Sequence, residues 1–193
     1  MKKYFSLDEV GEVSEYVGCK VKYNKEEGYM KLTQLVLIQS FRDEFELPEI
    51  EYKTPAAPNE SLVEGLFLEE EMHKQYRKGV GKLIHLSKYS RPDLLNAVRE
   101  LTKFGNKLGL VHYKAMVRLM KFYWQARNEG LMINPNKRWD VVNKNYLFEI
   151  TGESDSTFAS DPETKRSVSG WSAKLNNVPY TRKSKMQRFV TLK

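Results

Sequence analysis

The sequence predicts an α+β protein with three parts in order: a hairpin-plus-helix N-terminal piece, a helical middle and a three-stranded antiparallel meander. Three observations predict this order. Residues near the N-terminus alternate between apolar and polar with the period of a strand. The middle of the chain carries apolar side chains at helical spacing. Near the C-terminus, strand-like runs are separated by a tight-turn signal.

The N-terminal piece begins with a strand over Val17–Tyr23, where apolar and polar residues alternate. Asn24–Gly28 is polar and ends in glycine, so it suits a turn, and Tyr29–Leu32 suits the returning strand. We expect Thr33 to cap a helix that covers Gln34–Phe45.

A proline-rich stretch follows this helix. Pro48, Pro55 and Pro58 exclude regular structure over residues 47–61, which predicts a linker. The expected division of the chain is therefore residues 1–60, residues 62–145 and residues 146–193.

Three helices are expected in the middle part. The first covers Glu70–Ser87, where Gly79 and Gly81 would let another element approach closely. The second starts at Pro92, because proline is favoured at the first helical position. The third covers Leu110–Asn128. We expect one face of it to be apolar (Val111, Ala115, Leu119, Phe122, Ala126) and the opposite face to carry Lys114, Arg118 and Lys121.

The last part reads as a meander. Its expected strands are Tyr146–Thr151, Val168–Leu175 and Val178–Lys183. Asn176-Asn177 between the last two favours a tight turn, because asparagine tolerates a positive φ.

Composition and charge limit the functional classes. The chain has 193 residues, 40% of them hydrophobic, with a mean hydropathy of −0.61, as in globular proteins. Its longest apolar run is Leu35–Ile38, no secretory signal is recognisable, and Cys19 is the single cysteine. We therefore expect an intracellular protein, cytoplasmic or nuclear, with no membrane partner, no intramolecular disulfide and no cysteine-based zinc site.

The net charge of +7 is unevenly distributed. Residues 1–71 carry 8 Lys/Arg and 16 Asp/Glu, residues 72–148 carry 16 and 4, and residues 149–193 carry 8 and 5. The excess of positive charge in residues 72–148 favours nucleic acid as a partner. An equal alternative is that the acidic residues of the first third pair with the basic residues of the middle third.

Two groups of residues in the last part carry candidate chemistry. Asp155 is expected just after a strand, where a carboxylate can serve as a Mg²⁺ ligand, but aspartate is also common at the start of a loop. Lys183 and Lys185 belong to a basic cluster that either contacts phosphates or protects a strand edge.

The ordered motifs of the chain resemble a copia-type retrotransposon polyprotein, from the end of its reverse transcriptase region into the start of its RNase H domain. The resemblance covers nearly the whole chain. Its most specific block is Tyr76-Arg77, Gly81–Ile84, Ser90–Asp93 and Ala97-Val98. The other matching stretches are Val10–Val13, Tyr16–Gly18, Leu32–Gln34, Lys53–Pro55, His112, Ala115, Arg118, Gly130-Leu131, Ser154–Ser156, Arg166–Gly170, Lys183–Lys185 and Gln187.

The resemblance implies a polymerase and RNase H ancestry with both catalytic sets incomplete. The polymerase carboxylates of the family would precede Met1, and the remaining RNase H acids would follow Val190–Leu192. Asp155 matches the first metal-binding aspartate, which makes it the candidate catalytic and metal residue. Thr157 stands where the family usually has a second acid. Mg²⁺ or Mn²⁺ would bind only if the missing carboxylates were supplied, since two-metal hydrolysis needs several.

Three hypotheses stay open. In the first, the chain is a fragment or decayed copy of the polyprotein that binds an RNA–DNA hybrid or another nucleic acid without catalysis of its own. Its candidate contacts are Lys114, Arg118, Lys121, Lys183 and Lys185. In the second, it is part of a longer active reverse transcriptase/RNase H enzyme, and its partner is the remainder of the polyprotein. In the third, it is a non-functional, poorly folded remnant.

Overall fold

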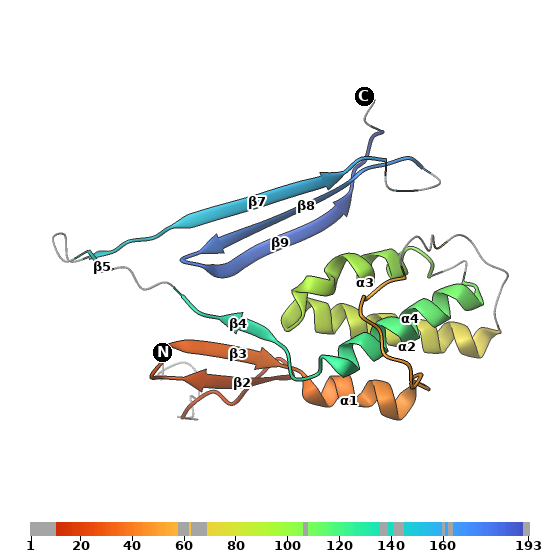
Figure 1. Ribbon diagram of the computed structural model, residues 1–193, viewed down its shortest axis with the longest axis horizontal. Helices are drawn as coiled ribbons and strands as arrows, with labels where there is room; N and C mark the ends of the chain where they lie inside the picture. The colour runs from red at the N-terminus through yellow and green to blue at the C-terminus, as the bar shows by residue number, and fades with distance from the viewer. Residues whose placement is uncertain are drawn as a thin grey trace, which may run out of the picture.

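A helical body with a sheet on either side makes up the chain (Figure 1). The structure is a computed structural model, which describes residues 11–57, 62, 69–105, 108–135, 139–140, 145–159, 161 and 164–190. In sequence, the short strands β5 (Trp139–Asp140) and β6 (Asn145–Tyr146) lie between the first sheet and the C-terminal sheet, and they pair with each other.

The first sheet has four antiparallel strands in the order β1 (Glu15–Tyr16), β2 (Cys19–Asn24), β3 (Tyr29–Thr33) and β4 (Leu131–Ile133). The sequence pattern did not predict β4, which pairs with β3 from about a hundred residues further along the chain. Gly130 makes this pairing possible. A Cβ atom there would lie 2.1 Å from the carbonyl oxygen of Leu32, so a side chain cannot fit.

Four α-helices form the body: α1 (Leu35–Glu44), α2 (Glu70–Tyr89), α3 (Leu95–Thr102) and α4 (Leu110–Gln125). A short 3₁₀ turn, η1 (Pro92–Leu94), leads into α3, as the proline predicts. Gly79 lies against α4, where an added Cβ would lie 2.4 Å from the sulfur of Met116. The close approach expected in α2 thus occurs at Gly79, whereas nothing lies within 4 Å of a Cβ at Gly81.

All four helices contribute to one hydrophobic core. Ile38 and Phe41 of α1 are fully buried together with residues of α2, α3 and α4. α1 therefore packs with the helices that follow the proline-rich stretch. The buried core residues are Ile38, Phe41, Phe45, Tyr76, Val80, Leu83, Leu86, Leu94, Val98, Leu101, Leu108, Met116, Leu119, Met120 and Tyr123.

The start of α1 differs from the prediction. Thr33 is the last residue of β3 and does not cap the helix, because Gln34 occupies the N-cap position without a side-chain cap bond. The Gln34 side chain is instead buried against α2. Its Oε1 accepts a hydrogen bond of 2.9 Å from Ser90 Oγ, and its Nε2 lies 2.9 Å from His85 Nδ1. This buried polar group joins the first sheet to the helical body.

The proline-rich stretch lies against α4. It has no helix or strand over its described residues 47–57, as expected; residues 58–61 of the predicted linker lie outside the described part. Tyr52 N–H donates to Gln125 Oε1 at 3.0 Å, and Gln125 Nε2 donates to Tyr52 O at 3.2 Å. We call residues 47–57 the strap. The predicted boundary at this stretch stays a prediction, although α1 and α2 share a core across it.

The buried face of α4 is rotated from the predicted one. His112, Met116, Leu119, Met120 and Tyr123 are buried, whereas only Leu119 of the predicted stripe is. Ala115 and Phe122 are half-buried against the edge of the core. Methionine, tyrosine and histidine fill this face, and the prediction gave too little weight to these side chains as core residues.

The C-terminal sheet is an antiparallel meander in the order β7 (Ile150–Thr157), β8 (Val168–Leu175) and β9 (Val178–Met186). Asn176 and Asn177 adopt the positive φ values of 49° and 67° that the tight turn needs. The strand expected at Tyr146–Thr151 was placed too early. The Asn176 side chain holds the segment just before β7 outside the ladder, because its Oδ1 accepts from Glu149 N–H and its Nδ2 donates to Leu147 O.

The meander rests on the helical body through β9, while β7 lies farthest from it (Figure 1). Arg182 Nη2 donates to the carbonyl oxygen of Lys88 at 3.1 Å, and Ser184 Oγ donates to Asn96 Oδ1 at 3.3 Å. In the loop between β7 and β8, Asp161 Oδ2 pairs with Lys103 Nζ at 2.9 Å. These contacts fix the meander against the C-terminal end of α2 and against α3.

Candidate nucleic-acid interface

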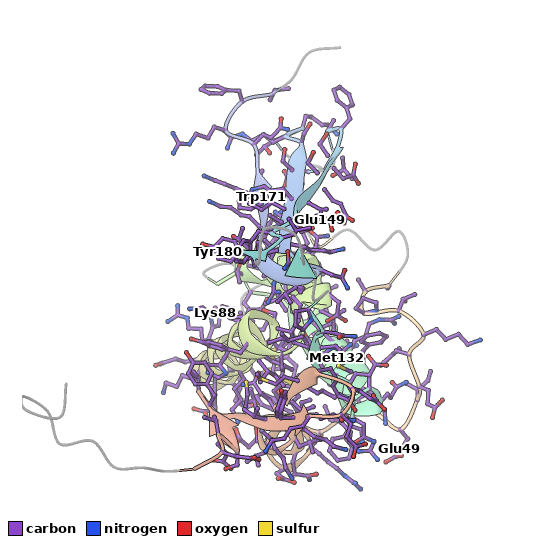
Figure 2. All side chains as sticks on the ribbon, turned by 90° about the vertical axis from the view of Figure 1, so that its left-hand side faces the viewer. Glu49, Lys88, Met132, Glu149, Trp171 and Tyr180 are labelled. Atoms are coloured by element: carbon purple, nitrogen blue, oxygen red, sulfur yellow. The ribbon has the colours of Figure 1, made fainter. Side chains whose placement is uncertain are left out.

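One face of the meander presents cations and an aromatic ring to solvent. In an antiparallel sheet, directly opposite residues share a face. Trp171 of β8 is opposite Lys183 of β9, and Ser169 is opposite Lys185. Lys183 and Lys185 are exposed, and Trp171 is 43% exposed between them and β7. We call this the outward face; Figure 2 shows Trp171 on the meander, which rises above the helical body.

Cationic and aromatic side chains gather around a hollow on the outward face. A shallow hollow of about 360 Å³ lies on it, lined by Trp171, Lys183, Lys185 and Arg188 among others. Neither lysine forms an ion pair with a residue that the structure describes. Free ammonium groups bind phosphates, and an indole ring provides a surface on which a base can stack.

Asp155 lies on the other face of the meander. It is within β7 rather than just after a strand, and it is opposite Gly170, which is opposite Ser184. Its side chain is exposed and accepts a hydrogen bond of 2.7 Å from the N–H of Ser156. The candidate metal residue and the candidate phosphate contacts Lys183 and Lys185 therefore do not face the same way.

The described carboxylates do not gather around Asp155. Glu153, on the same face of β7, pairs with Lys174 at 3.4 Å. Asp161 is directed to Lys103 and to Thr164, whose N–H and the Lys103 ammonium hold the pKa of Asp161 well below its usual range. Within the described ranges, no three His, Cys, Asp or Glu side chains form a group that could hold a metal ion. These residues alone do not fit a two-metal centre.

The candidate contacts on α4 are in a different environment. Lys114 is exposed, and Lys121 is half-buried. The guanidinium of Arg118 stacks on the Tyr52 ring at 4.1 Å, and its Nη2 donates to Thr54 Oγ1 at 3.1 Å. Arg118 thus holds the strap on α4. α4 packs against α1, α2 and α3, so the structure does not join this group to the outward face of the meander.

Residues of the most specific matching block are structural. Arg91 is only 4% exposed and binds Asp93 through two nitrogens, at 3.0 and 2.8 Å. Its Nη1 donates to the carbonyl oxygen of Ala126 at 3.1 Å, and its Nη2 lies 3.2 Å from Glu129 Oε2. Arg91 thus clamps the corner after α2 to the end of α4.

Two other residues of the resemblance have structural roles too. Tyr76 is buried, and its hydroxyl donates to the carbonyl oxygen of Leu101 at 2.7 Å. His112 is buried, and its Nδ1 accepts a 2.9 Å hydrogen bond from Gly109 N–H at the start of α4. These motif residues explain why the body folds, and they do not themselves mark a binding surface.

Sequence reasoning missed two exposed aromatic residues of the meander. The sequence pattern assigns Trp171 and Tyr180 only to expected strands, and the structure shows Tyr180 to be 78% exposed. For Trp171, the sequence contained a usable signal. The turn at Asn176-Asn177 fixes the register of the two strands, and strict alternation then places Trp171 on the same face as Lys183. Tyr180 sits at a register shift of β9 opposite Ala173-Lys174, which the sequence does not reveal.

Comparisons with known proteins show similarity to retrotransposon polyproteins. Over 139 residues it is 28% identical to the retrovirus-related Pol polyprotein from transposon RE1 of Arabidopsis thaliana, a match that covers 71% of this chain and 9% of that protein. Over 199 residues it is 21% identical to the retrovirus-related Pol polyprotein from transposon TNT 1-94 of Nicotiana tabacum, covering all of this chain and 14% of that protein. The chain is thus similar to retrotransposon polyproteins, and it spans a small part of their length.

A match to a shorter protein identifies the family to which the chain belongs. Over 117 residues the chain is 31% identical to the secreted RxLR effector protein 161 of Plasmopara viticola, a match that covers 61% of this chain and 76% of that protein. The chain belongs to the family of this protein. No family model and no solved structure matches the chain. Among the described residues, no helix has both the length and the apolar character to cross a bilayer.

Proposed function

We propose that the chain is a nucleic-acid-binding remnant of the reverse transcriptase/RNase H region of a copia-type polyprotein, without catalysis of its own. The ligand in this proposal is an RNA–DNA hybrid or another nucleic acid. The outward face of the meander carries the proposal, because Lys183 and Lys185 lie there beside Trp171 without an acidic partner among the described residues. Lys114 and Lys121 on α4 form a second, separate contact group in this proposal.

The proposed contacts predict binding that does not depend on the base sequence. Two lysines contact phosphates without reading bases, and an indole ring stacks on any base. The charge of the middle part adds long-range attraction for a polyanion.

The test is a salt titration with the purified chain. A fluorescently labelled RNA–DNA hybrid is titrated with protein at several salt concentrations, and fluorescence anisotropy gives the affinity. We expect the affinity to fall steeply with salt, with a slope of about −0.9 for each phosphate contact in a plot of the two logarithms. Undetectable or salt-insensitive binding contradicts the proposal.

The enzymatic alternative depends on carboxylates supplied by further chain. In a longer product that contains them, Asp155→Asn abolishes cleavage of the hybrid, and Ser156→Ala, its neighbour on the opposite face, leaves cleavage intact. Full activity of the Asp155 variant contradicts the assignment. Mg²⁺ or Mn²⁺ enters only under this alternative.

The remnant alternative is tested by folding. The single core that joins all four helices favours a folded body. We expect a cooperative thermal transition by circular dichroism, whereas a chain without a packed core gives no such transition.

The relative from Plasmopara viticola supports a second candidate function, because its name describes a secreted effector and 76% of its length matches. Under this candidate, the chain acts outside the cell that makes it. A tagged chain expressed in the cells of its source is then recovered from the medium. Recovery from the cells alone contradicts this candidate and leaves the nucleic-acid proposal unaffected.

A further inference from the structure

A pocket lies where the meander meets the helical body. Its volume is about 550 Å³, which is within the usual range for small-molecule sites. α2 and α3 form one wall, and β9 forms the other. In Figure 2, Lys88 lies on the helix and Tyr180 on the meander above it, on the same side of the molecule. The charged and aromatic lining residues are Lys88, Arg99, Arg182 and Tyr180.

The charged groups that line the pocket are all cations. Lys88 Nζ lies over the ring of Tyr89 at 5.2 Å and forms no ion pair with a described carboxylate. Arg182 donates to the carbonyl oxygen of Lys88, and burial lowers the pKa of its guanidinium, an effect that Asp93 opposes. A half-buried cation that forms no ion pair lowers stability, and a bound anion would offset that cost.

Arg99 adds an unsatisfied donor. Its Nη2 binds Asn96 Oδ1 at 3.1 Å and pairs with Glu100, so part of its charge is compensated. Its Nε is buried and has no hydrogen-bond partner among the described residues. A buried N–H without a partner is unfavourable, and it points to an acceptor supplied by a ligand.

We propose that this pocket binds a phosphate-bearing anion, which Lys88, Arg99 and Arg182 hold between the helical body and β9. Arginine matches phosphate with parallel N–H donors, and lysine adds a point charge. The proposal does not depend on the outward face, because Arg182 and Lys183 are neighbours in β9 whose side chains lie on opposite faces. The phosphate belongs either to a free oligophosphate or to a nucleic-acid strand.

The test compares a pocket substitution with a substitution in the first sheet, each of which removes one positive charge. Inorganic tripolyphosphate is titrated into the full chain by isothermal calorimetry at low salt. We expect Arg182→Gln to weaken binding about tenfold, the loss of one charge-assisted hydrogen bond, and Lys22→Gln, at an exposed position of β2, to leave it nearly unchanged. Lys88→Gln is the second pocket variant, because its exposed side chain is not needed for the contact between β9 and α2.

A second probe separates the two sources of phosphate. A single-stranded DNA 12-mer is titrated into the same variants. If tripolyphosphate binds and the pocket variants lose it, a free oligophosphate is the ligand. If only the 12-mer binds, and Arg182→Gln and Lys88→Gln weaken it, the phosphate belongs to a strand. If neither probe responds to the pocket variants, or if Lys22→Gln weakens both probes as much as the pocket variants do, the pocket proposal is wrong, whatever the outward face binds.

Discussion

At the scale of single residues, the strongest constraints are steric and buried polar ones. Gly130 has no room for a Cβ atom, and Arg91 fills a buried site where it binds three partners, Asp93, the Ala126 carbonyl and Glu129. Both residues belong to the stretches on which the resemblance to copia-type polyproteins rests. At these two positions, the close packing and the buried hydrogen bonds of the fold explain the type of residue.

Gly130→Ala is expected to lower the free energy of unfolding by about 2 kcal/mol or more, because the new methyl group must displace the Leu32 carbonyl and with it the β3–β4 pairing. Urea unfolding followed by circular dichroism measures the change. The control is Gly81→Ala in α2, where nothing lies within 4 Å and alanine favours the helix by up to about 1 kcal/mol. Equal effects of the two substitutions contradict this account.

Arg91→Lys is expected to lower the free energy of unfolding by about 2–3 kcal/mol, since lysine keeps the charge but cannot bind Asp93, Glu129 and the Ala126 carbonyl at once. The same unfolding measurement applies. Arg127→Lys, on the exposed surface next to this site, is the control and is expected to change stability by less than about 0.5 kcal/mol. A tolerated Arg91→Lys refutes the role of Arg91 as a clamp.

At the scale of elements, the hydrophobic period predicted which helices and strands exist better than it predicted their first and last residues. The helix expected at Glu70–Ser87 covers Glu70–Tyr89, and the strand expected at Val168–Leu175 has those limits. The early placement of β7 has a physical cause, because Tyr146–Thr151 is the more apolar stretch. The ladder with β8 selects Ile150–Thr157 instead, and all its side chains are exposed. No local pattern reveals β4, whose partner β3 is distant in sequence.

The docking of the meander on α3 is expected to depend on pH through Asp161. The lowered pKa means that its carboxylate stabilises the fold above the unfolded pKa of about 3.9, and this stabilisation is lost as the pH falls through the folded value. Asp161→Asn therefore unfolds more easily at pH 7, by about 1–2 kcal/mol, and the difference narrows below about pH 4. The free energy of unfolding of both proteins from pH 7 to pH 3 measures this. A difference that stays constant over that range contradicts the assignment.

At the scale of the whole molecule, charge connects the parts. Glu44 of the acidic first third pairs with Lys78 at 2.8 Å and Lys82 at 2.6 Å, and these lysines lower its pKa. The alternative in which the acidic third pairs with the basic middle therefore holds at this point of contact between α1 and α2. The lysines of the outward face lie elsewhere, which leaves them available for a polyanion.

The sequence predicted the candidate lysines but not how they group. Lys183 and Lys185 share a face because the turn at Asn176-Asn177 sets their register. Arg118 was proposed for nucleic acid, yet it stacks on Tyr52 of the strap, a partner 66 positions earlier in the chain. Which partner a long cationic side chain takes is decided by tertiary packing, and periodicity within a helix does not contain that information.

The most direct test of the central proposal compares two lysine pairs in hybrid binding. Lys183→Gln/Lys185→Gln removes two charges from the outward face, and Lys22→Gln/Lys31→Gln removes two from a directly opposite pair in the first sheet. Fluorescence anisotropy with a labelled RNA–DNA hybrid, at about 50 and 200 mM salt, gives both affinities and their salt dependence. The account predicts that the first variant weakens binding about tenfold or more and makes the salt slope shallower by about 1.8, while the second changes both much less. Equal losses from the two variants would mean that net charge alone attracts the hybrid and would contradict binding at the outward face.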